Sequence, residues 1–341
     1  MKKIKRADIE RILILCAATL VVVLALQGGD QTTSQVLVEQ TSIPIEQTMT
    51  SQNAEMVSTV VFYEDGDGYL VPVTRQIEKT DGIARATLNL MVKDSANDMQ
   101  AARLGLRTVI PEGTTFEIDI ADGRANVNVS KEALTCASAA EEALMVDAIT
   151  NTMACFSSVD EVTLEFDGQK RSRLTYGTDV SGVFSGGKLN LESVETFSKD
   201  AGLVQLYFPS QTGRMLVPVT RTVFSTADVA TAVLELAKGP KDDSGLERAL
   251  PADCGVKNVT MKDGVVSINF SREFKEVMEN SDGGEQAIRA ILFTCSQFPG
   301  VKKVEVLVEG QKLEKQPPAA PTFINDETEV MAQYPGVVEL D

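Results

Sequence analysis

The sequence contains no histidine and no tryptophan among its 341 residues. Histidine is the usual general base near neutral pH and the commonest metal ligand, so Ser-His and Cys-His nucleophile pairs and most zinc sites are excluded. The five cysteines form no Cys-x-x-Cys motif, which disfavours zinc and thioredoxin-like chemistry. With five tyrosines and no tryptophan, few side chains are available for stacking against a sugar ring.

Positive charge is also scarce, because 32 Lys and Arg stand against 49 Asp and Glu, giving a formal net charge of −17. Nucleic acid is therefore not expected as a partner, since phosphate binding needs clustered positive charge. Carboxylates remain the only route to acid–base catalysis, and Glu141 and Glu142 are the adjacent pair considered. Neighbours on a helix point about a hundred degrees apart and cannot share a substrate. A glycosidase built from two carboxylates distant in sequence stays a weak alternative.

Residues 1–29 combine a basic start with an uncharged, apolar run over residues 12–29. The run is longer than a signal-peptide core and slightly shorter than a full membrane span, and residues 25–27 (ALQ) form a poor cleavage site. We therefore expect an uncleaved N-terminal anchor, with a cleaved signal peptide as the alternative. Leu15 before Cys16 argues against a lipoprotein. The positive-inside rule places the rest of the chain outside the cytoplasm, behind a flexible Gln-, Thr- and Ser-rich tether at residues 30–56.

The most informative feature of the sequence is an internal duplication. Residues 263–273 (DGVVSINFSRE) echo residues 122–132 (DGRANVNVSKE), and the LVPVTR of residues 70–75 recurs at 216–221. Because the matches keep the same order, we infer two tandem domains at 57–174 and 203–315, a length that suits globular domains better than solenoid repeats. The linker 175–202 and the acidic, proline-containing tail 316–341 are both expected to be exposed.

Strand and helix patterns alternate within each repeat. Alternating apolar and polar residues predict strands, as at 116–120 and 266–270, and apolar spacing of three or four predicts helices, as at 229–237. Asp122-Gly123 and Asp263-Gly264 are tight-hairpin signals. The predicted fold class is α+β: two tandem repeats, each a mostly antiparallel sheet with two helices on one face.

Two motifs that resemble functional signatures favour structural roles. Asp65-Gly-Asp-Gly68 could begin a calcium loop, but Gln76 stands at the twelfth position where a bidentate Glu is needed, so we predict a plain turn. Ser130 and Ser271 lie in Asn-x-Ser sequences at the ends of predicted strands, and we expect them to cap helical turns.

Cys155 and Cys295 are expected at the same buried helix position in the two repeats, as small core residues. A disulfide would need Cys136 or Cys254, which have no match between the repeats, or a bridge between the domains, and none is expected. No residue is assigned a catalytic, cofactor-binding or metal-ligating role, and no cofactor is predicted.

The second repeat resembles the GerM domain of sporulation and spore germination proteins. The resemblance rests on residues 234–240 (LELAKGP), Leu250-Pro251, residues 263–271, the helix ending at Cys295 and the strand Val304–Val308. It covers roughly residues 57–170 and 203–313, and the tandem pair behind an export segment strengthens it. The first repeat departs from the pattern, because Asp94-Ser95 stands where the second has Gly239-Pro240.

The resemblance implies a fold similar to the ring-building modules of secretion and sporulation complexes. It implies a non-enzymatic, membrane-tethered structural or assembly protein in endospore formation or spore germination, whose partners are other membrane or intermembrane sporulation proteins. Its domains would lie outside the cytoplasm on the cell membrane, at the forespore boundary between two membranes. Two alternatives stay open. One is a binding module for a small ligand or for the cell-wall glycan peptidoglycan, and the other is a cell-wall hydrolase.

Overall fold

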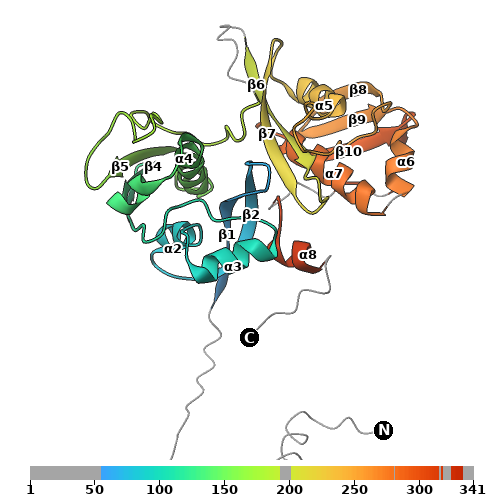
Figure 1. Ribbon diagram of the computed structural model, residues 1–341. Helices are drawn as coiled ribbons and strands as arrows, with labels where there is room; N and C mark the ends of the chain where they lie inside the picture. The colour runs from blue at the N-terminus through green and yellow to red at the C-terminus, as the bar shows by residue number, and fades with distance from the viewer. Residues whose placement is uncertain (1–54, 193–200, 280, 315, 318–323, 333–341) are drawn as a thin grey trace, which may run out of the picture. The chain divides into compact units, whose positions relative to one another are not determined.

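The computed structural model describes residues 55–192, 201–279, 281–314, 316–317 and 324–332 (Figure 1). The predicted anchor at 1–29 lies outside these residues, as does nearly all of the tether. Repeat 1 contains β1 (Met56–Glu64), β2 (Leu70–Glu78), α2 (Ile83–Asn89), α3 (Ser95–Arg103), β3 (Phe116–Ala121), β4 (Arg124–Val129), the 3-10 helix η1 (Lys131–Thr135), α4 (Ala139–Ala154) and β5 (Glu161–Phe166).

Repeat 2 follows the same order, and both repeats belong to one compact unit, Asn53–Asp341. The predicted succession of strands and helices is confirmed, with the short helices α3, η1 and α6 added. The elements of repeat 2 are β6 (Gly202–Pro209), β7 (Leu216–Val223), α5 (Val229–Lys238), β8 (Val256–Lys262), β9 (Val265–Phe270), α6 (Phe274–Glu279), α7 (Ser281–Ser296) and β10 (Lys303–Val308), followed by β11 (Gln311–Lys312) and α8 (Glu327–Ala332).

Each repeat contains a two-stranded hairpin and a separate sheet, which has three strands in repeat 1 and four in repeat 2, where the short β11 pairs with β10. The hairpins are β1–β2 and β6–β7, both antiparallel. In both sheets the first pair is antiparallel and the second parallel, in the orders β3-β4-β5 and β8-β9-β10-β11. The α+β class with mostly antiparallel pairing is confirmed. The single sheet expected in each repeat is divided in two, a hairpin and a second sheet.

The predicted tight turns are confirmed. Asp122 and Gly123 join β3 to β4 with φ angles of 51° and 78°, and Asp263 and Gly264 join β8 to β9 with 54° and 81°. Positive φ at both central residues defines a type I′ turn, whose twist matches that of the strands it connects. These turns set the register that places Phe116 opposite Val129 in repeat 1.

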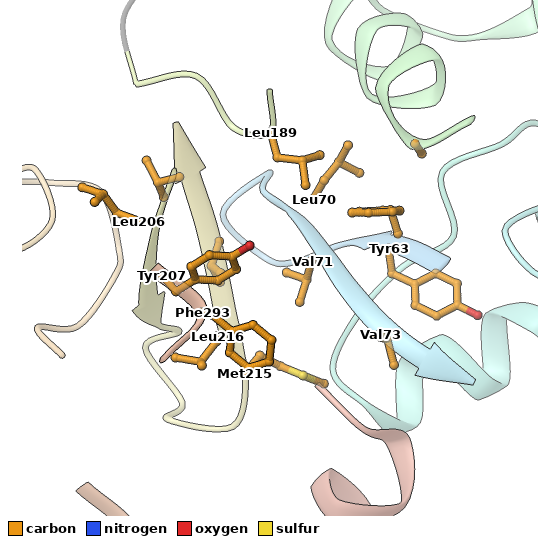
Figure 2. Close-up of a cluster of buried hydrophobic side chains, with 14 of the residues drawn as sticks. Tyr63, Leu70, Val71, Val73, Leu189, Leu206, Tyr207, Met215, Leu216 and Phe293 are labelled. Carbon is orange, nitrogen blue, oxygen red and sulfur yellow. The ribbon is translucent and has the colours of Figure 1, made fainter. Parts of the chain in front are cut away.

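Alternation gives each hairpin two faces. The face that we call inner turns toward the helices of its own repeat: Thr59 in β1 hydrogen-bonds Thr87 in α2 at 2.8 Å, and Arg221 in β7 donates to the Glu235 carbonyl in α5 at 3.1 Å. The opposite, outer face carries Tyr207 in repeat 2 and Phe62 in repeat 1, which are both buried. Figure 2 shows the apolar cluster to which both hairpins contribute.

The linker and the tail were predicted to be exposed, but both contain buried residues. Val180 and Leu189 are buried in the linker, and Asn325 and Val330 are buried in the tail. Helix α8 lies beside β2 of repeat 1 (Figure 1). The exposure prediction is therefore wrong for these residues and holds for most of the other described linker residues, because apolar residues spaced singly in a polar or Gly-rich stretch give no periodic signal.

Candidate functional site

The carboxylate pair considered from the sequence has a structural role. Glu142 is 2% exposed, and its carboxylate accepts hydrogen bonds from the backbone N–H of Tyr176 at 2.9 Å and of Thr178 at 3.0 Å. Glu141 lies in the first turn of α4, where its carboxylate accepts from the Ala137 N–H at 3.1 Å and its own N–H donates to Ser138 Oγ. The two carboxylates hold different segments and do not converge on one point.

Asp147, on the same helix, is the carboxyl group most altered by burial. Removal from water raises its pKa to about 6. A raised pKa can mark a general acid, although buried structural carboxyls show the same shift. When α4 and α7 are aligned along their full lengths, Asp147 corresponds to Arg289 in repeat 2, which forms an ion pair with Glu329 at 3.2 Å.

The two signature-like motifs also have structural roles, one as predicted and one not. Asp65 closes its own turn, since its carboxylate accepts from the N–H groups of Asp67 at 2.9 Å and Tyr69 at 2.8 Å, so the turn prediction is confirmed. Ser130 and Ser271 precede helical turns, but their hydroxyls accept from Thr115 N–H and Gly255 N–H across the strand ends. Ser130 does stand at the N-cap position of η1, but it makes no side-chain cap bond, because its hydroxyl is taken by the N–H that precedes β3.

The expected equivalence of the two cysteines is also wrong. Cys295 is fully buried in α7, whereas Cys155 is exposed at the C-terminal cap of α4. Alignment of the two helices pairs Cys295 with the buried Met153, and Cys155 with Gln297. Desolvation of its thiol raises the pKa of Cys155 to about 11, so the thiol stays protonated at neutral pH. All four cysteines in the described residues are free.

A cavity of about 460 Å³ separates the outer faces of the two hairpins. Cys155, Thr74 and Tyr207 are among its lining residues, and none of the lining side chains is charged. At the position equivalent to Cys155, Gln297 accepts from the Gln205 N–H at 2.8 Å and donates to the Gln205 carbonyl at 2.6 Å. The shorter cysteine cannot make the matching contacts with β1, so space is left at this end of α4.

A second cavity, of about 1000 Å³, lies within repeat 2. It is the more polar of the two, because three exposed carboxylates line it together with two arginines: Glu247, Glu276, Glu285, Arg248 and Arg289. This cavity is where a hydrolase would have its acid and base, so its carboxylates are the ones to test. In the described residues, no three Cys, Asp or Glu side chains converge as a metal site would require.

The outer face of the β6–β7 hairpin carries an exposed apolar patch. Phe224 is 70% exposed, Leu203 40% and Leu191 45%. Leu203 lies opposite Thr222, two residues before Phe224, and Leu191 pairs with Thr220 on the other edge of β7. Because paired residues share a face, Leu203 and Leu191 lie on the same side of the hairpin, and Phe224 directly follows β7; we call these three exposed residues the apolar face.

The equivalent positions in repeat 1 are polar. The strand registers place Ser58 where repeat 2 has Leu203, and Glu78 where it has Phe224, while Asp326 takes the place of Leu191. Ser58 accepts a hydrogen bond from Gln76 at 2.7 Å, and Met56 is the one apolar side chain on this surface. Sequence analysis missed the apolar face, although comparing the two hairpins position by position would have shown it.

Comparison with known proteins agrees with this architecture. The sequence model of the family described as "Germane: Sporulation and spore germination" matches residues 60–172 and 205–314, which lie within the predicted domains. The chain is 29% identical over 273 residues to the spore germination protein GerM of Bacillus subtilis (strain 168), covering 76% of this chain and 74% of the relative.

Solved structures agree as well. The tandem GerMN domains of the sporulation protein GerM from Bacillus subtilis match with a TM-score of 0.66 and 26% identity, covering 79% of this chain and 99% of that one. The tandem α+β repeats, the matched motifs and these comparisons confirm the resemblance found in the sequence. The chain belongs to the Germane family of sporulation and spore germination proteins.

Proposed function

We propose that the chain is a non-enzymatic, membrane-tethered assembly protein whose apolar face binds another protein outside the cytoplasm. Its family and its relative support a role in sporulation or germination. The observation that carries the finer proposal is the difference between the two hairpins. One outer face exposes Leu203 and Phe224, where the other has Ser58 and Glu78. Exposed contiguous apolar side chains in a soluble domain mark contact surfaces.

The chemistry of the partner surface follows from that face. Phe224 and its two leucine neighbours offer an aromatic anchor without a charged group, so the matching surface of the partner is apolar. The net charge of −17 on this chain favours a partner whose rim carries Lys and Arg. We propose such a protein among the membrane or intermembrane components of the sporulating cell.

The non-enzymatic part of the proposal is supported by the engagement of the carboxylates. Glu142 is occupied by backbone N–H groups, and the cavity beside Cys155 has no charged lining. The carboxylates Glu247, Glu276 and Glu285 line the larger cavity but are exposed to water. An acid–base pair works in a site that closes around the substrate and excludes water, and these exposed carboxylates do not form such a site.

The tether is proposed from the sequence alone. The basic start and apolar run of residues 1–29 lie outside the described residues. None of the helices that the structure describes, from α2 to α8, has the length and apolarity needed to span a bilayer. We propose that residues 1–29 anchor the chain in the cell membrane and that both repeats lie on the outer side of this membrane. In a sporulating cell, that side faces the space between the two forespore membranes.

Complementation of a deletion strain tests the contact surface. The double variant Leu203→Asp, Phe224→Asp should fold but fail to restore heat-resistant spore counts or germination, because a charge in the buried centre of a contact opposes binding. Ser58→Asp, at the matched position in repeat 1, should restore both. A photocrosslinking residue at position 224 should capture a second protein, and a crosslink only to this chain's own residues or to peptidoglycan would overturn the proposal.

The hydrolase alternative is tested in the same strain. The variant Glu247→Gln, Glu276→Gln, Glu285→Gln and the single variant Asp147→Asn should each restore sporulation and germination fully. If one of them abolished function while folding, membrane location and crosslinking at position 224 stayed normal, the carboxylate would be acting chemically. That result would reject the non-enzymatic part of the proposal and leave the contact surface standing.

A further inference from the structure

Two short segments of the chain share a pattern that none of the comparisons mentions. Residues 189–192 (LNLE) follow repeat 1, and residues 324–327 (INDE) follow repeat 2. Each has an apolar residue, then Asn, any residue, and Glu. Each lies along the hairpin of the other repeat: Leu191 pairs in parallel with Thr220 of β7, and Asp326 pairs in parallel with Thr74 of β2.

The two asparagines make matching hydrogen bonds with the repeats exchanged. Asn190 Oδ1 accepts from the Leu70 N–H at 2.9 Å, and its Nδ2 donates to the carbonyls of Leu70 at 2.9 Å and Pro218 at 2.7 Å. For Asn325 the partners are the Leu216 N–H at 2.8 Å and the carbonyls of Leu216 at 3.0 Å and Pro72 at 2.8 Å. Each asparagine therefore links β2 to β7 while satisfying the edge of both strands.

The prolines explain why an amide side chain is needed there. Pro72 and Pro218 lie in the middle of the strand edges and donate no hydrogen bond, so the two edges cannot form a regular ladder with each other. Their carbonyls still need donors. An asparagine amide donates to one carbonyl of each strand and accepts from one N–H, so it satisfies the backbone groups that the interrupted edges leave unpaired.

The glutamate and the backbone complete the match. Glu192 forms a bidentate pair with Arg221 at 2.6 and 2.8 Å, and Glu327 pairs with Arg75 at 2.6 Å. Both arginines lie on the inner faces of their hairpins, at equivalent positions in β2 and β7. Both ion pairs are largely buried. The Thr74 N–H donates to the Asn325 carbonyl at 2.7 Å, whereas the Thr220 N–H is shared between the carbonyls of Leu189 at 3.0 Å and Asn190 at 3.3 Å.

We propose that the facing edges of β2 and β7, together with Arg75, form a recognition site for an extended peptide of the form Leu/Ile-Asn-x-Glu. The chain's own residues 324–327 fill the site, and the partner that fits it is a protein segment with the same motif. Recognition combines addition of an extended segment at a strand edge with a side-chain amide and a charge-assisted pair. Occurrence of the same contacts twice in one chain carries the inference, which does not depend on the apolar face.

The test uses the full chain with a weakened tail, Asn325→Ala, Glu327→Gln, and fluorescent peptides measured by anisotropy. A peptide of residues 322–332 should bind the variant and not the unaltered chain, whose site is filled. A peptide of the linker residues 187–193 should bind the variant within about tenfold of the tail peptide. Replacing Asn by Ala in either peptide should weaken binding on the order of tenfold or more, because three hydrogen bonds are lost.

Two results would overturn the proposal. One is a folded variant, with faster amide exchange at Thr74 showing the edge vacated, that binds neither peptide. The other is binding that does not respond to the Asn substitution, which would show simple apolar association. If the double variant does not fold by itself, the tail peptide should restore its folding, and the Asn-to-Ala form of the peptide should not. A tail peptide that does not restore folding rejects the proposed site.

Discussion

Replacing Asp147 by Asn should make the folded chain more stable at pH 7 and leave its stability at pH 4 nearly unchanged. Burial raises the pKa of this carboxyl from 3.8 to about 6. Below pH 3.8 both the folded and the unfolded state hold the proton, so the group has no effect on unfolding. As the pH rises from about 4 to about 6, the unfolded state releases its proton first, and the free energy of unfolding falls.

The shift sets the size of the effect. One pKa unit corresponds to about 1.4 kcal/mol, so ionised Asp147 lowers the stability of the native chain at pH 7 by at most about 3 kcal/mol. An asparagine keeps the shape but carries no charge, although a buried amide without partners removes part of the gain. We expect a net increase of about 1 to 3 kcal/mol at pH 7 and less than about 0.5 kcal/mol at pH 4.

Urea unfolding of both proteins at pH 4, 5, 6 and 7, followed by circular dichroism, measures the difference. Other carboxyl groups also titrate over this range, so only the difference between the two proteins reports on position 147. Asp119→Asn on β3, an exposed site, is the control and should change stability by less than about 0.5 kcal/mol at every pH. A difference that is constant with pH, or a less stable variant at pH 7, would show that Asp147 is ionised in the folded chain and held by an unrecognised donor.

Three further predictions follow from the contacts around the linker and the helix ends. Glu142→Ala should destabilise the chain by about 3 kcal/mol in urea unfolding, because buried hydrogen bonds from the N–H groups of Tyr176 and Thr178 are lost. Glu141→Ala should cost only about 1 kcal/mol, and equal losses of stability in the two variants would contradict the different roles given to the two carboxylates. Cys155→Gln should add about 1 kcal/mol by copying the contacts of Gln297, while Cys155→Ser should not, and an unchanged stability for the Gln variant would reject the alignment. In native labelling at pH 7.5, Cys155 should react about tenfold more slowly than an ordinary thiol. A pKa of about 11 in place of 9.0 lowers the thiolate fraction about a hundredfold, and the greater nucleophilicity of the more basic thiolate recovers about tenfold, so labelling at the ordinary rate would show a different environment.

Much of the fold could be predicted because it depends on local signals. The Asp-Gly turns at 122–123 and 263–264 require positive φ, and the alternation in β4 and β9 distinguishes buried from exposed side chains, so sequence and structure agree there. The helices α4 and α7 were predicted for the same reason, since apolar spacing of three and four residues is visible in one dimension. Nothing distant in the chain is needed to form these elements.

The errors arose where a single residue meets a distant one. Asn190 and Asn325 bond to strands up to 253 residues away, and an isolated asparagine in a polar stretch carries no periodic signal of such a contact. Cys155 was paired with Cys295 by residue type, although the register of α4 and α7 pairs it with Gln297. The apolar face was missed because Leu191, Leu203 and Phe224 lie on three separate segments.

The duplication separates the residues that join the repeats from those that distinguish them. The strands at 70–75 and 216–221 are identical, and the Asn and Glu that bind their edges occur after both repeats, so the union of the repeats is symmetric in its chemistry. The outer faces differ, because Leu203 and Phe224 stand where repeat 1 has Ser58 and Glu78. A duplicated chain with two equal faces would present the same surface twice. Since only repeat 2 carries the apolar face in the described residues, the protein contact proposed for this face would form once in each chain, and the duplication would not double it.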